Sequence, residues 1–60
     1  MKIYVLLREK KTELGSVWSI DRVTTNYNEI QEDLEFLRNV FRCKVEVWEN
    51  SAYIEKINYN

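Results

Sequence analysis

A single cysteine and no histidine leave this 60-residue chain without the cross-links that usually stabilise small domains. A domain of this length buries only about 60% of the surface that its unfolded chain exposes, and disulfides or metal sites commonly compensate. One cysteine cannot form an internal disulfide, and zinc sites built from histidine or paired cysteines are excluded. We therefore expect a dense core, association with another chain, or both.

The charge balance narrows the classes of function. Nine Lys and Arg stand against ten Asp and Glu, for a net charge of −1, whereas a nucleic-acid-binding domain normally carries a basic face. Catalysis by an imidazole base is excluded, and the chain is short for an enzyme. We expect a single domain over residues 1–60 that is not an enzyme and binds neither a cofactor nor a metal.

Two features bear on the compartment. The N-terminal apolar run at residues 3–7 is too short for the hydrophobic part of a signal peptide or for a membrane span. The lone Cys43 lies in an apolar context, which is typical of a buried structural cysteine in a reducing environment. The sequence therefore predicts a cytoplasmic protein that does not enter a membrane.

Residues 27–42 carry the pattern of an amphipathic helix. Apolar side chains recur there at spacings of four, three and four residues, at Ile30, Leu34, Leu37 and Phe41. Asn26 followed by Glu29 three residues later resembles a capping box, with Asn in place of Ser or Thr. The mid-stripe residues Leu34 and Leu37 are expected in the core.

Four segments read as strands, at residues 2–8, 16–23, 43–49 and 52–57. Residues 9–15 are predicted to form a loop that ends in Gly15, and Asn50-Ser51 to form a tight turn. The fold class is α+β, with ββαββ order and one helix on one face of a four-stranded mixed sheet. The preferred strand order is 2-1-4-3, as in β-grasp domains, and the alternative is 2-1-3-4.

The faces of the strands follow from the alternation of side chains. If the helix covers Ile3, Val5 and Leu7, then Tyr4 and Leu6 point outward. On the second strand the bulkier Trp18 and Ile20 are placed toward the core. On the third strand, Cys43, Val45 and Val47 share the covered side and Trp48 lies opposite.

Two candidate interaction surfaces result. Tyr4, Leu6 and Trp48 on the uncovered sheet face suit a protein partner or a homodimer, although the same face is also compatible with plain surface or with stacking of nucleic-acid bases. Glu29, Glu32 and Asp33 form an acidic helix face, which suits a solvated surface, a docking site for a basic partner, or a pair of catalytic carboxylates. We expect binding of a protein through these six residues, and the alternative is a nucleic-acid-binding domain.

The opening residues Met1-Lys2-Ile3-Tyr4-Val5-Leu6, together with the order of the elements, resemble short uncharacterised reading frames of phages and prophages. The resemblance covers those six residues and the element order. It implies no known activity and no binding residue. It implies a small accessory protein that acts on a host or regulatory protein.

Overall fold

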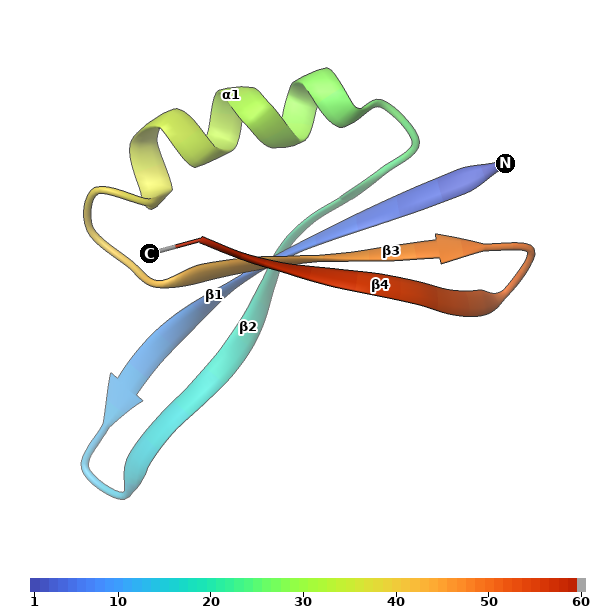
Figure 1. Ribbon diagram of the computed structural model, residues 1–60. Helices are drawn as coiled ribbons and strands as arrows, with labels where there is room; N and C mark the ends of the chain where they lie inside the picture. The colour runs from blue at the N-terminus through green and yellow to red at the C-terminus, as the bar shows by residue number, and fades with distance from the viewer. Residues whose placement is uncertain (60) are drawn as a thin grey trace.

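The structure, a computed structural model, describes residues 1–59 and consists of one antiparallel sheet with a helix on one side (Figure 1). The elements are β1 (Lys2–Thr12), β2 (Gly15–Thr24), α1 (Tyr27–Leu37), β3 (Cys43–Glu49) and β4 (Ala52–Tyr59). The predicted α+β class and the ββαββ order are confirmed.

The strands lie in the order β2-β1-β3-β4, and every neighbouring pair is antiparallel. The preferred order 2-1-4-3 and the mixed sheet that it requires are therefore wrong, and the alternative 2-1-3-4 is confirmed. The apolar β3 lies beside β1, where Val45 pairs with Leu6 and both are fully buried. The more polar β4, with Glu55 and Lys56, takes an edge, where charged side chains are tolerated and discourage further strand pairing.

Each of the two hairpins is closed by a turn of two residues. The predicted loop at residues 9–15 shrinks to a turn at residues 13–14, and Gly15 adopts a φ of 132°, which favours glycine. The turn at Asn50-Ser51 is confirmed, with φ values of 52° and 66°. Positive φ at both central residues is the signature of the type I′ turn, whose twist matches that of the paired strands.

The helix begins where the sequence predicts, but its cap differs from a capping box. The Asn26 side chain accepts a hydrogen bond from the Asn28 backbone N–H at 3.0 Å. Glu29 does not reach back to the Asn26 N–H, which instead donates to the Thr24 hydroxyl at 3.0 Å. The Glu29 carboxylate accepts a hydrogen bond from the same hydroxyl. Thr24 at the end of β2 therefore joins strand and helix.

The helix ends at Leu37, five residues before the predicted end at residue 42. The Asn39 side-chain amide donates to the Glu35 carbonyl at 3.0 Å, and Val40 and Phe41 N–H both donate to the Leu37 carbonyl. An Asn side chain that competes for a backbone carbonyl favours termination of a helix. The turn that follows still carries Phe41 to the edge of the core.

The core lies between α1 and the inner part of the sheet. Its buried members are Leu6, Ile30, Leu34, Cys43 and Val45, and the half-buried Tyr4, Tyr27, Leu37 and Phe41 pack around them. The expected burial of Leu34 is confirmed, with 4% of the residue exposed. The predicted side of β3 is also confirmed, because Cys43, Val45 and Val47 are all buried.

The predicted faces of β1 are reversed. Leu6 is fully buried under α1, and the Tyr4 ring lies 5.1 Å from the Tyr27 ring of the helix. Ile3, Val5 and Leu7 consequently face away from the helix. Both sides of β1 are apolar, so alternation within the strand contains no signal that chooses between them.

The predicted core positions on β2 are also wrong, because of a β-bulge. Leu6 pairs with Arg22 and Leu7 pairs with Ile20, so Asp21 is the extra residue. The bulge turns Arg22 toward α1 and leaves Ile20 63% exposed on the opposite side. Trp18, at 38% exposure, lies on that side as well.

Candidate interaction surface

The sheet has one face that α1 covers and one that no described segment covers (Figure 1). We call the second the open face. Strand alternation and the cross-strand register place ten principal side chains on it. They are Ile3, Val5, Leu7, Trp18, Ile20, Val23, Lys44, Glu46, Trp48 and Tyr53, and the same register places Glu9, Lys11, Ser16, Lys56 and Asn58 at the margins of this face.

Half of the open face, over β1 and β2, is apolar. Ile20 is 63% exposed and Val23 is 59% exposed, and each pairs with an apolar residue of β1, Leu7 and Val5 respectively. Ile3 extends this apolar half toward the start of β1 and is 39% exposed. Contiguous apolar surface of this kind is uncommon on monomeric proteins and marks interaction sites.

The other half, over β3 and β4, combines charges with aromatic rings. The Lys44 ammonium lies 4.5 Å from the centre of the Trp18 ring, so it bridges the two halves. The Trp48 indole N–H donates to Glu46 at 3.4 Å, and its ring meets the Tyr53 ring edge-on at 5.4 Å. These contacts hold the aromatic rings in place before any partner binds.

Trp48 is the one predicted sheet-face residue that lies on the open face, where it is half-buried. Tyr4 and Leu6, the other two, lie under the helix and are corrected to core positions. Ile20, which was predicted to point toward the core, was missed as a surface residue, and Val23 was not named as part of the predicted interaction surface. Their spacing of three breaks the alternation of a regular strand, and this irregularity is the sequence signal for the bulge between them.

The acidic helix face is largely occupied by contacts within the chain. Arg22 Nη1 lies 3.2 Å from Glu29 Oε2, and Arg22 Nε binds the Asp33 carboxylate. The hydrogen bond that the Arg22 guanidinium donates to Asp33, together with the negative charge of that carboxylate, raises the pKa of Arg22. Two of the three predicted acidic residues thus join α1 to β2, and Glu32 is the one that stays exposed.

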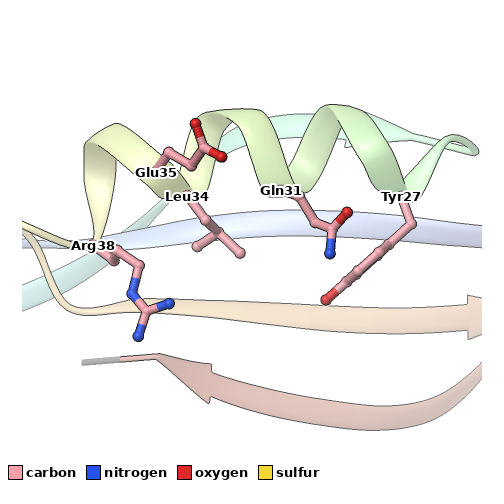
Figure 2. Close-up of a pocket in the computed structure, with 5 residues that line it drawn as sticks. All are labelled: Tyr27, Gln31, Leu34, Glu35 and Arg38. Atoms are coloured by element: carbon pink, nitrogen blue, oxygen red, sulfur yellow. The ribbon is translucent and has the colours of Figure 1, made fainter.

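A shallow groove of about 330 Å³ runs along α1 above β3 and β4 (Figure 2). Tyr27, Gln31, Leu34 and Arg38 point from the helix toward these strands, and the Glu35 carboxylate points away from them. All five lining residues come from one helix. The groove offers one cation, one amide and one phenol around an apolar side chain, which is an ordinary amphipathic surface.

The remaining charged cluster lies near the N-terminal end of β3. Arg8 Nε is 3.2 Å from the Asp21 carboxylate, and its guanidinium lies 4.8 Å from the centre of the Phe41 ring. Nearby Cys43 is 1% exposed, and burial raises the pKa of its thiol, with Asp21 adding to the effect. Over residues 1–59, no three acidic or cysteine side chains gather closely enough to hold a metal ion.

Comparison with protein-family models, curated proteins and solved structures found no match to this chain. None of them therefore supports the resemblance of residues 1–6 to phage reading frames. Among the described residues, α1 lacks the length and the apolar character that a membrane-crossing helix needs.

Proposed function

We propose that the chain is a non-enzymatic module that binds a protein through the open face. The observation that supports this most directly is the apolar half over β1 and β2, where Ile20 and Val23 are each more than half exposed. Each square ångström of apolar surface removed from water contributes roughly 25 cal/mol. A partner that covers this half therefore gains free energy from the burial of these apolar side chains.

The aromatic residues of the open face support the same proposal. Trp and Tyr are the residues that most often dominate the energy of protein interfaces. Trp18 lies under Lys44, and Trp48 is held by Tyr53 and Glu46. Rings that are already ordered lose little conformational entropy when a partner binds, so more of the contact energy contributes to affinity.

The charges of the open face favour a protein over a nucleic acid. Lys44 and Lys56 are accompanied by Glu46, which lies directly opposite Lys56 in the register. A nucleic-acid-binding surface relies on unopposed cations that release counterions from phosphates. Stacking of nucleic-acid bases on Trp18 and Trp48 is the alternative function. The affinity for a nucleic acid falls steeply as the salt concentration rises, which distinguishes this function from the binding of a protein.

The proposal is tested by affinity capture with the wild-type chain and with Ile20→Ser. Ile20 is exposed and lies outside the core, so the variant is expected to fold while its apolar patch is weakened. The matched control is Val40→Ser, which removes an apolar side chain that is 74% exposed after α1. We expect proteins from a lysate of the source organism to be retained by the wild type and by Val40→Ser and to be lost with Ile20→Ser.

Equal retention by both variants would contradict binding through the open face. A labelled single-stranded oligonucleotide supplies the second arm of the experiment. Binding of the oligonucleotide that weakens steeply with salt, and is lost with Ile20→Ser, would replace the proposed function with the nucleic-acid alternative.

A further inference from the structure

Resting on the proposed function, we infer that the partner which the open face fits is a second copy of this chain. The two copies pack sheet against sheet, about 10 Å apart, as the two layers of an aligned β-sandwich. A twofold axis lies in the interface and crosses the strands between the level of Val5 and the level of Leu7. This arrangement follows from the order of side chains along the open face.

The register defines two adjacent rows of side chains across the sheet. The first row contains Val23, Val5, Glu46 and Lys56, and the second contains Ile20, Leu7, Lys44 and Asn58. A twofold axis between the rows places each row opposite the other row of the second copy. Val5 then lies opposite the partner's Leu7, which is only 9% exposed, and the largely exposed Val23 faces the partner's Ile20, so the apolar halves meet.

The charges complement each other in the same arrangement. Glu46 faces the partner's Lys44, and Lys44 faces the partner's Glu46, because a twofold axis makes every contact occur twice. A twofold axis along the strands would instead place β2 against β4, with apolar side chains over charged ones. Burying charges without partners is costly, so the axis across the strands is favoured.

The size of the molecule agrees with a second copy. Its broadest side measures 38 × 23 Å, so the open face cannot exceed about 870 Å², and an interface of the usual roughly 800 Å² for each partner would use nearly all of it. A domain of this length is also marginal alone. The dimer covers the open face of each copy with a second apolar layer. This burial compensates for the lack of disulfide and zinc cross-links.

Charge reversal tests the arrangement. Lys44→Glu creates two contacts between glutamates, and Glu46→Lys creates two contacts between lysines, so each single variant is expected to dimerise about 100-fold more weakly than the wild type. An equimolar mixture of the two variants restores both attractive contacts. We expect sedimentation velocity over a micromolar concentration series to show a wild-type dimer, weakened single variants and a restored heterodimer.

Lys10→Glu and Glu32→Lys are the matched controls. They change the net charge by the same amounts at exposed positions outside the open face. Each control variant is expected to dimerise like the wild type, and their mixture is expected to show no preference for the heterodimer. Thermal melts of all four variants identify any loss of folding.

Three outcomes would overturn the inference. They are a wild-type monomer of 7.3 kDa throughout the series, folded single variants that dimerise as the wild type does, and a test mixture that associates no better than the control mixture. If the chain stays monomeric while Ile20→Ser still abolishes capture of another protein, the second copy is excluded and the proposed function stands. If capture is insensitive to Ile20→Ser, the proposed function fails separately.

Discussion

Cys43 opens β3 at the edge of the core, where its thiol has almost no access to solvent. The thiol lies 3.7 Å from the Phe41 carbonyl and is surrounded by packed residues. A thiolate needs a nearby cation or a helix N-terminus to be stabilised. Burial has the opposite effect and raises the pKa, which agrees with a structural cysteine.

This shift predicts a dependence of stability on pH. Below the ordinary pKa of 9.0, the thiol is protonated in both the folded and the unfolded chain. Above 9.0 the unfolded chain loses the proton while the folded chain keeps it, so the free energy of unfolding falls as pH rises. Urea midpoints measured below and above pH 9.0 should show this fall, and Cys43→Val should show a smaller one. Equal falls in both proteins would assign the effect to other groups.

The contacts at the junction between β2 and α1 fix the position at which the helix begins. Asn26 caps the helix, Thr24 satisfies the Asn26 N–H, and Arg22 holds Glu29 and Asp33 from the strand. The helix therefore starts at a fixed point relative to the sheet. Partly exposed ion pairs contribute only about 0–1 kcal/mol each, so the cap and the packing carry most of the stability of this junction.

The cap provides a prediction for this element. Asn26→Ala removes the acceptor for the Asn28 N–H and is expected to lower the free energy of unfolding by about 1 kcal/mol. Asn28→Ala is the control, since it keeps that backbone N–H and substitutes a better helix former. Chemical denaturation followed by far-UV circular dichroism compares the two. Equal losses would show that the Asn26 side chain does not cap the helix.

The whole molecule is a sheet held by one short helix, and the helix is anchored by few side chains. Ile30 and Leu34 are the buried residues of α1, and they meet Leu6 and Val45 of the central strands. With one covered face, the molecule has a small core for its surface. Its stability therefore depends strongly on each anchoring residue.

Leu34→Ala is expected to destabilise the chain by about 2–5 kcal/mol, which approaches the low end of about 5 kcal/mol for whole native proteins. Phe36→Ala, on the same helix at 78% exposure, is the control and should leave the melting temperature close to that of the wild type. Thermal unfolding measured by far-UV circular dichroism provides the test. An unchanged melting temperature for Leu34→Ala would show that α1 packs by another face.

The features that the sequence predicts well are those with local causes. The stripe through Ile30 and Leu34 indicates the helix, the alternation from Cys43 to Glu49 predicts β3 with both of its bounds, and Asn50-Ser51 predicts the turn after it. In each case, neighbours along the chain supply the periodicity or the permitted backbone angles. Trp48 is placed on the open face for the same reason, because its strand is apolar on the other side.

Tertiary structure alone decided the strand order and the faces of β1, whereas for β2 the spacing of Ile20 and Val23 indicates a bulge and the tertiary structure decided which side faces the helix. Leu6 and Leu7 are equally apolar, so burial under α1 depends on which of them pairs with Val45 of β3. The bulge at Asp21 turns Arg22 toward the Asp33 carboxylate, a contact between residues 11 positions apart. Pairing between distant segments produces no periodic pattern in the sequence, because the free energy of pairing arises only when the segments come together in the fold.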